Sequence, residues 1–235
     1  NNFMIKGKKK IMELTYGYGK EIRHFCVSEN NLLCQVTQNR INVSCTGIDA
    51  VKEALNNPIG TPRLKEIVKP GEKVVIITSD ITRPCPSQLI IPEIIMELNQ
   101  AGVRNEQITV VFALGSHRFQ TPDEQRKLVG DWVYDKIKCV DAAKESFVHI
   151  GVTSFGTPVD IDPVVAKADR RICVGNIEFH YFAGYSGGAK AVMPGVSTQE
   201  AIQKNHSRMV LEEAKAGSLS QNPLRQDIEE AAAMV

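Results

Sequence analysis

Apolar and polar segments alternate from about residue 73 onward in a way that predicts strands and helices in turn. Residues 73–79 and 108–114 are short, continuous runs rich in β-branched residues, typical of strands buried on both faces of a parallel sheet. Between them, apolar residues recur at helical spacing over residues 87–99, and Gly102 follows as a stop signal. This stretch therefore predicts a strand, a helix and a second strand.

The same alternation continues through the middle of the chain. Thr121-Pro-Asp-Glu124 is a capping box with proline at the first helical position, and it opens a helix that ends near Gly130. Further strands are expected at residues 136–140, 147–152 and 171–177. Repeated units of this size predict an α/β domain with a mostly parallel, Rossmann-like sheet and flanking helices.

The two ends of the chain depart from this pattern. Short strands expected around residues 16–19 and 32–36 predict an N-terminal antiparallel extension. At the other end, Asn222-Pro223 begins a helix, and residues 224–235 stay amphipathic to the last residue without a closing signal. We expect the chain to stop inside or just after this helix.

Composition narrows the class of partner and the compartment. The 235 residues include 28 Lys or Arg and 27 Asp or Glu, which leaves a net charge of +1. This balance predicts neither a nucleic-acid nor a membrane partner, and no apolar run approaches the roughly 18 residues of a membrane span. The six cysteines contain no Cys-x-x-Cys pair and are scattered: Cys26, Cys34, Cys45, Cys85, Cys139 and Cys173. We therefore expect a cytoplasmic protein that binds a small molecule, with no structural zinc site.

Three polar side chains follow predicted strands, where ligands collect in open α/β sheets. Asp80, His117 and His180 are expected to converge on one crevice there. Imidazole gives and takes a proton near neutral pH, and two histidines after neighbouring strands predict the paired acid and base that a racemase or epimerase needs. The alternative is that each histidine is only a satisfied polar residue at a strand end.

The segment after the first buried strand, Asp80-Ile-Thr-Arg83, offers two charged groups. The planar fork of Arg83 suits a carboxylate or a phosphate, and Asp80 is placed to orient an imidazole or a cation. The alternative is a plain turn in which Asp80 caps the next helix and Arg83 forms a surface ion pair.

The glycine-rich segment from Gly184 to Ala191 resembles a phosphate loop, in which backbone amides cradle an anion. An alanine precedes Lys190, however, and Ala191 stands where a phosphate loop needs a hydroxyl. Gly187 and Gly188 are therefore expected to let a ligand approach the backbone, with Lys190 at its edge. The alternative is a surface turn with a solvated lysine.

His206 follows a short helix that the capping box Ser197-Thr-Gln-Glu200 is expected to open. It is a candidate metal ligand, or a helix-end residue that interacts with the helix dipole.

Four motifs together resemble the nickel-dependent lactate racemase family: Asp80-x-Thr-Arg-Pro84, Gly115-Ser-His-Arg118, the segment from His180 to Lys190, and His206. They occur in the same order and at similar spacing, and the resemblance covers about residues 14–215. Four ordered motifs are far more specific than any one of them.

The resemblance implies an isomerase that racemises a lactate-like 2-hydroxy acid. It implies a nickel pincer nucleotide attached covalently to Lys190, with His206 as the protein ligand to nickel. His117 and His180 would be the acid and base while hydride passes to and from the cofactor. Arg83 would hold the substrate carboxylate or the cofactor, and Asp80 would position a histidine.

The resemblance also implies maturation proteins as partners and a second, C-terminal domain. Maturation proteins build the cofactor, so recombinant protein made without them is expected to be unloaded. Residues 1–235 would be the N-terminal cofactor-binding and catalytic domain of a longer two-domain protein, and without the C-terminal domain we expect little or no racemase activity. Two alternatives remain: a non-catalytic nucleotide- or anion-binding module, and an enzyme in which Lys190 forms a Schiff base.

Overall fold

The computed structural model describes residues 10–235 and places them in two compact units, one ending at Ser44 and one running from Cys45 to Val235. All six cysteines are free thiols. No helix within the described residues is long and apolar enough to cross a membrane.

The first unit is an antiparallel hairpin of β1 (Ile11–Tyr18) and β2 (Glu21–Ser28), followed by the 3₁₀ turn η1 (Glu29–Asn31). Gly19 forms the turn with a φ of 61°, a conformation that favours glycine. The hairpin confirms the predicted antiparallel extension. The strand predicted at residues 32–36 is wrong, because the segment forms no regular element and pairs with no strand among residues 10–235, and residues 33–36 are exposed.

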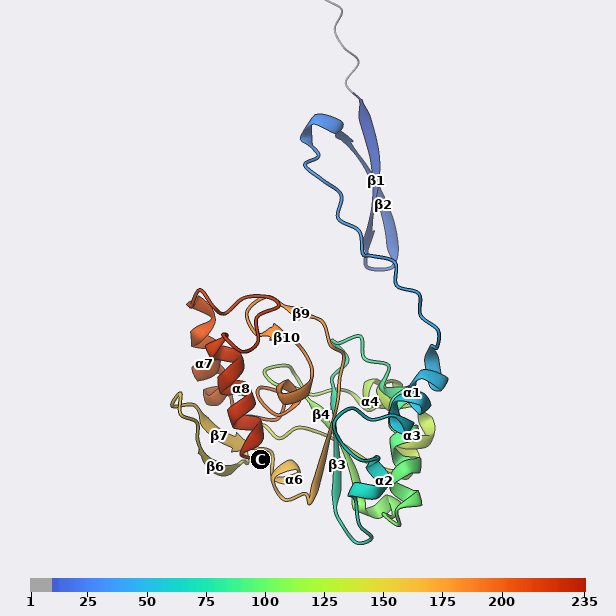
Figure 1. Cartoon of the computed structure of the whole chain (residues 1–235), viewed down its shortest axis with the longest axis vertical. Coiled ribbons are helices and arrows are strands. Elements are labelled where there is room, and N and C mark those ends of the chain that lie inside the picture. Colours follow the sequence, from blue (N-terminus) through green and yellow to red (C-terminus); the bar gives the residue numbers. More distant parts are fainter. Residues whose placement is uncertain (1–9) are drawn as a thin grey trace, which may run out of the picture. The chain divides into compact units, whose positions relative to one another are not determined.

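The second unit is built on a four-stranded parallel sheet in the order β5-β4-β3-β8. Its strands are β3 (Val74–Ser79), β4 (Ile108–Ala113), β5 (Lys138–Asp141) and β8 (Arg170–Val174). The two central strands, β3 and β4, are labelled in Figure 1. The sheet and the helices on both of its faces confirm the predicted α/β class. The predicted strand at 136–140 starts two residues late because the preceding helix continues to Lys136, and the strand predicted at 171–177 ends at Val174.

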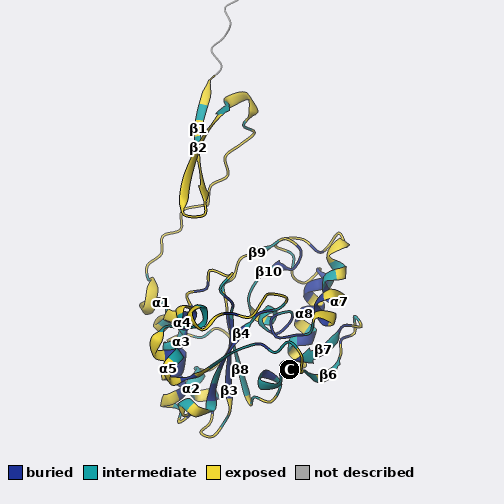
Figure 2. Ribbon diagram, turned by 180° about the vertical axis from the view of Figure 1, so that it is seen from behind, coloured by how far each residue is buried: buried dark blue, intermediate teal, exposed yellow. Residues whose placement is uncertain are grey.

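Helices cover both faces of this sheet. One face is covered by α1 (Gly47–Asn56), α2 (Leu64–Ile67), α3 (Ser87–Gln100), α4 (Pro122–Val129) and α5 (Asp131–Lys136). The other is covered by α6 (Pro163–Ala166), α7 (Gln199–His206) and α8 (Pro223–Ala233). Successive β3 residues alternate between the two cores, with Ile76 in the first and Ile77 in the second. Figure 2 shows the buried residues of the sheet and of the helices in dark blue. This two-sided burial explains the continuous apolar runs.

Smaller elements lie outside the parallel sheet. The strand predicted at 147–152 exists as β6 (Val148–Val152), but it pairs antiparallel with β7 (Pro158–Ile161) in a separate hairpin. A second small hairpin joins β9 (Phe179–His180) and β10 (Gly184–Tyr185). The remaining 3₁₀ turns are η2 (Asn105–Gln107), η3 (Gly188–Ala191) and η4 (Ser207–Val210).

The helix starts follow local side-chain chemistry, with one correction. Thr121 caps α4 in the predicted capping box with Glu124, and the Asn222 side chain caps α8. The cap of α7 is Thr198, not Ser197, because the Ser197 hydroxyl instead donates to the carbonyl of Val192 at 2.8 Å. At the other end of the helix, His206 is the last residue of α7 and does not lie beyond it.

Candidate active site

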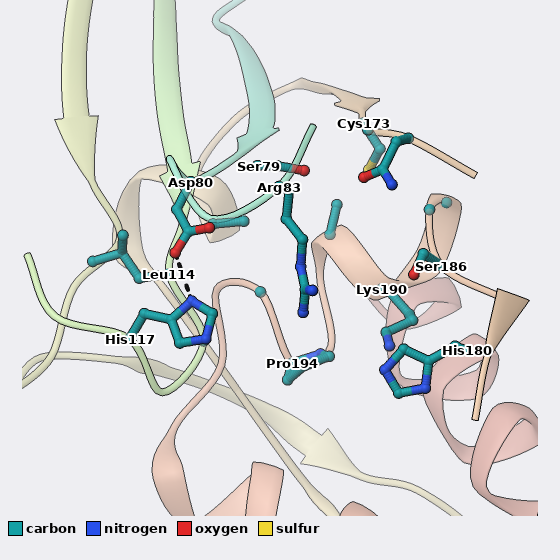
Figure 3. A pocket seen from close by; sticks show the side chains of 18 of the residues that line it. Ser79, Asp80, Arg83, Leu114, His117, Cys173, His180, Ser186, Lys190 and Pro194 are labelled. Atoms are coloured by element: carbon teal, nitrogen blue, oxygen red, sulfur yellow. Dashed lines mark hydrogen bonds and ion pairs between the residues drawn. The ribbon is translucent and has the colours of Figure 1, made fainter. Parts of the chain in front are cut away.

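The carboxyl ends of three neighbouring strands form one wall of a pocket. Ser79 of β3 pairs with Ala113 of β4, and Thr78 of β3 pairs with Val174 of β8, so the segments after these strands begin side by side. The pocket encloses about 900 Å³, part of it open to solvent. All the site residues predicted from the sequence line it: Asp80, Arg83, His117, His180, Gly187, Gly188, Lys190 and His206. Figure 3 labels Asp80, Arg83, His117, His180 and Lys190.

On one side of the pocket, Asp80 holds His117. The Asp80 carboxylate is buried and lies 2.6 Å from Nδ1 of His117, a turn residue just after β4. Its other oxygen accepts from the hydroxyl of Thr82 at 2.6 Å and from the Thr82 amide at 3.1 Å. The Asp80 carboxylate is therefore within hydrogen-bond distance of an imidazole. The alternative that it caps the next helix is wrong, because α3 begins at Ser87 without a side-chain cap.

A hydrogen-bond network fixes the two loops that carry this pair. The Ile81 amide donates to the side-chain oxygen of Gln120 at 2.8 Å, and Gln120 donates from its amide and its side chain to Asp141 at 2.7 and 3.1 Å. Lys144 Nζ donates to the carbonyl of Gly115 at 2.7 Å. The loops after β3 and β4 are thus tied to the end of β5, a link that no sequence motif indicated.

Arg83 reaches into the pocket from the loop after β3. In the view of Figure 3 it lies between His117 on one side and Lys190 and His180 on the other. Its positive charge acts on both of the latter side chains. This position suits an anionic group bound between the two histidines.

The glycine segment lines the opposite wall. Gly187 and Gly188 have φ values of 79° and 56°, in the left-handed region that side chains rarely adopt. A Cβ atom at Gly187 would also lie 3.2 Å from the carbonyl oxygen of Asn176. These two positions therefore require glycine for backbone conformation, whatever else they do, and the turn they form leads directly into η3.

Lys190 in η3 is half-buried, so it is not a solvated surface lysine. Burial, followed by the charges of Arg83 and Arg225, lowers the pKa of its amine to about 8, and Glu178 opposes the shift. A substantial fraction of the amine is consequently unprotonated in mildly alkaline solution. A neutral amine is a nucleophile, which a solvated lysine at neutral pH is not.

His180 reaches the pocket by a route that the sequence did not indicate. It does not directly follow β8 but lies in β9, and β3 separates β8 from β4, so the two histidines do not follow neighbouring strands. Its Nδ1 accepts a hydrogen bond from the amide of Ala183 at 3.2 Å. Burial first, and then the charges of Lys190 and Arg83, lower the pKa of His180 to about 4. The ring is therefore neutral at pH 7, with its proton on Nε2.

His206 lines the same wall at the end of α7. Its Nδ1 is buried and has no hydrogen-bond partner among residues 10–235. Burial and the charge of Lys190 lower its pKa, and the backbone of Ile202 opposes this shift. The imidazole is thus kept in the neutral form that metals bind.

Phe182 is a pocket-side residue that the sequence interpretation missed. Its ring packs edge-on against His180 and His206, with centroids 4.5 and 4.9 Å apart, and Lys190 Nζ lies 6.0 Å from its centre. This one aromatic side chain therefore contributes to the desolvation of all three basic groups. No spacing rule distinguishes Phe182 from the other aromatic residues in the same run.

A second missed feature is the buried carboxylate of Asp227 in α8. It accepts hydrogen bonds from Thr153 and Thr157 at 2.6 and 2.7 Å, from Asn205 at 2.8 Å and from Arg208 at 3.1 Å. Asn205 immediately precedes His206, so this network holds the end of α7 against α8. The four donors come from distant parts of the chain, which explains why no local pattern revealed them.

Metal binding by protein groups alone has no support here. Within residues 10–235, no three His, Cys, Asp or Glu side chains are placed to hold a metal ion together. A metal at His206 would therefore take most of its ligands from a bound molecule. A bound molecule that supplied the other ligands would have the amine of Lys190 and the turn at Gly187 and Gly188 beside the imidazole of His206.

Known proteins resemble the chain over most of its length. A family model described as the lactate racemase N-terminal domain matches residues 18–218. The lactate racemase of Thermoanaerobacterium thermosaccharolyticum is 31% identical over 218 residues, and that of Lactiplantibacillus plantarum is 35% identical over 185 residues. These matches cover 90% and 77% of this chain but 51% and 43% of the relatives. The chain thus spans about half the length of the curated relatives it matches.

Solved structures agree with this result. The lactate racemase apoprotein from T. thermosaccharolyticum superposes with a TM-score of 0.82 at 31% identity, covering 95% of this chain and 53% of that one. A protein from Thermotoga maritima shares the fold, with a TM-score of 0.65 at 22% identity, covering 80% of this chain and 47% of that one.

Proposed function

The chain belongs to the lactate racemase N-terminal domain family, and on this premise we propose that it is the catalytic half of an enzyme that racemises a 2-hydroxy acid. In this proposal residues 1–235 supply the cofactor-binding and catalytic domain of a longer two-domain protein. The observation that carries the proposal is the presence of His117, His180 and Lys190 around one pocket.

The residues on the wall that contains the glycine segment, Lys190 and His206 fit the nickel pincer nucleotide of this family. Lys190 would carry the covalent attachment, because a half-buried amine with a lowered pKa can act as a nucleophile. His206 would be the protein ligand to nickel, since its ring is neutral and lines the pocket. Gly187 and Gly188 would allow close approach of the nucleotide. When bound, the cofactor supplies a hydride acceptor and donor, which no side chain of this pocket provides.

His117 would act as the base toward the hydroxyl of the substrate. A carboxylate at Nδ1 favours the tautomer with the proton on that nitrogen, so Nε2 keeps a lone pair for the substrate. The negative charge of Asp80 then stabilises the imidazolium that forms on proton transfer. The histidine is less than half exposed on its side chain, at 44%, and remains open to the pocket.

His180 would serve the oxygen of the substrate from the other wall. In the free pocket its Nε2–H can donate a hydrogen bond, whereas proton transfer needs a ring that titrates near neutral pH. Attachment at Lys190 would convert the amine to an uncharged group and so remove one cause of the low pKa of His180. Inversion in the opposite direction would use the two histidines in exchanged roles.

Arg83 would hold the carboxylate of the substrate between the two histidines. A planar guanidinium binds a carboxylate through two parallel hydrogen bonds, which orients the neighbouring α-carbon. The half of the relatives that this chain lacks would then help to exclude water, and the isolated chain would be inactive. Maturation proteins that build the cofactor would be its protein partners.

The test uses the full-length protein coexpressed with a cofactor maturation system. We expect bound nickel, a covalent adduct on Lys190 by peptide mass spectrometry, and racemisation of at least one member of a panel of 2-hydroxy acids. Lys190→Arg should remove the adduct and lower the rate at least about a thousandfold, as is typical when a residue of a catalytic unit is removed. Lys144→Arg, which changes a lysine that does not line the pocket, should keep the adduct. Full racemisation without an adduct would refute the proposal.

One observation favours a second candidate, a Schiff-base enzyme: the lowered pKa of Lys190 also suits attack on a carbonyl. The two functions separate by borohydride reduction in the presence of a 2-oxo acid. A stable adduct of the oxo acid on Lys190, together with turnover in the absence of nickel, would favour the Schiff base.

A further inference from the structure

We propose that Arg225 is a positioning residue for Lys190: from α8 it holds the glycine segment in place and stands as a fixed positive charge behind the lysine. It lies outside every motif by which the sequence suggested a site. The inference rests on the proposed function for its purpose, since a tethering lysine must be both presented to the pocket and reactive.

The contacts of Arg225 tie it to the segment that carries Lys190. The side chain is buried, at 8% exposure, and its Nη1 donates to the carbonyl of Tyr185 at 3.0 Å. A Cβ atom at Gly188 would lie 3.9 Å from its other terminal nitrogen. The guanidinium thus bridges the end of β10 and the start of η3, on either side of the turn at Gly187.

The first turn of α8 strengthens this arrangement. Asn222, the cap of α8, also donates to the carbonyl of Phe182 at 2.8 Å. Residues 182 and 185 are therefore both held by side chains from the start of α8. The segment between them cannot shift without breaking one buried and one partly buried hydrogen bond. The ring of Phe182 and the amine of Lys190 keep their relation for the same reason.

The charge of Arg225 is only partly balanced. Its Nε donates to Glu229 at 2.7 Å, but the side chain of Glu229 is 54% exposed and its charge is screened by water. Toward η3, the guanidinium faces glycine backbone and a second cation. The positive charge therefore acts on Lys190 through the protein and favours the neutral amine, in the direction found for its pKa.

Arg83 acts on Lys190 in the same direction, but the two arginines differ in one useful respect. Arg83 lines the pocket and would touch a ligand, whereas Arg225 is not among the pocket-lining residues. A change at Arg225 therefore tests positioning and charge without removing a ligand contact.

The experiment measures the reactivity of Lys190 in the protein without cofactor. The chain is acetylated with an N-hydroxysuccinimide ester between pH 6 and 10, and the rate at Lys190 is read by peptide mass spectrometry. Arg225→Met should raise the pH midpoint and slow acetylation at pH 7 about threefold to tenfold, because a rise of one unit in pKa lowers the neutral fraction tenfold. Arg225→Lys keeps the charge and should restore the rate to within about twofold.

Two controls keep the result decisive. Lys144, which is also partly buried but lies near Asp80 and Asp141, should react at the same rate in every variant. Glu229→Gln leaves Arg225 in place and removes its exposed partner, so the midpoint of Lys190 should fall slightly, and this variant serves even if Arg225→Met unfolds.

An unchanged midpoint in folded Arg225→Met, or a raised midpoint in Glu229→Gln, overturns the inference. If full-length wild-type protein coexpressed with the maturation system carried no adduct on Lys190 while these shifts were observed, that result would count against the proposed function alone.

Discussion

The two walls of the pocket differ in the charges that surround their basic groups. On the wall formed by the loops after β3 and β4, a buried carboxylate is paired with His117, and Gln120 ties those loops to the end of β5. On the wall formed by β9, η3 and α7, three bases lie near one another around Phe182, and burial lowers the pKa of each. The first wall pairs its imidazole with a buried carboxylate, whereas burial on the second wall disfavours the positively charged form of each base.

This difference assigns different chemistry to the two walls. A histidine with a fixed carboxylate suits repeated proton transfer. On the second wall, the amine of Lys190 and the imidazole of His206 suit attachment and ligation, which both need a lone pair. His180 shares that wall and, in the proposed function, serves the substrate oxygen. Arg83 lies between the two walls and is the group that a bound anion would neutralise.

Removal of either histidine should have the largest effect. In the loaded full-length enzyme, His117→Asn and His180→Asn should each lower kcat by about 10² to 10⁴-fold, the range for general acid or base catalysis. Asp80→Asn should lower it less and add nothing further to His117→Asn, because the two residues act as one unit. Chiral chromatography of the products measures each rate. An Asp80→Asn enzyme with the wild-type rate would break the distinction between the walls.

The second wall should also depend on Asp227 for its stability. Asp227→Asn should lower the free energy of unfolding by about 3 kcal/mol, since it removes a buried ion-pair partner that has four donors. Asp160→Asn is the matched control: its pair with His149, at 2.6 Å, is largely exposed on the histidine side, and the change should cost less than about 1 kcal/mol. Urea denaturation followed by circular dichroism gives both values. Equal losses would show that burial of the Asp227 network is unimportant.

The smallest expected effect sharpens the electrostatic contrast. Lys190→Met removes a charge but keeps the bulk, so the pKa of His180 should rise from about 4 by up to about one pH unit. Because this pKa lies below the ordinary 6.5, the unfolded chain binds more protons than the folded chain between pH 6.5 and 4. The stability of the wild-type protein therefore decreases as the pH is lowered through that window. The substitution should lessen that fall. NMR titration of the histidine ring protons measures the pKa. Lys144→Met removes a lysine that does not line the pocket and should leave the pKa of His180 unchanged.

Much of the fold was predictable because its determinants are local. The buried strands β3 and β4, the helix between them and the capped start of α4 each follow from neighbouring residues, since periodicity and capping act within a few positions. The predicted strand at 32–36 was wrong because an apolar run forms a strand only where another strand pairs with it. β6 was predicted as a strand, but its partner β7, and with it its place outside the parallel sheet, is a tertiary property.

The sequence by itself determined which groups are available for chemistry: the family motifs, the strand-end position of Asp80 and the two glycines that a left-handed turn requires. Only the tertiary structure decided their environment. His180 reaches the pocket through a small hairpin, and Phe182 contributes to the desolvation of three bases at once. From α8, Arg225 bonds Tyr185, 40 residues earlier, and Asp227 bonds Thr153, 74 residues earlier. Desolvation and Coulomb interactions depend on distance in space, so pKa values and the roles that follow from them have no local sequence pattern.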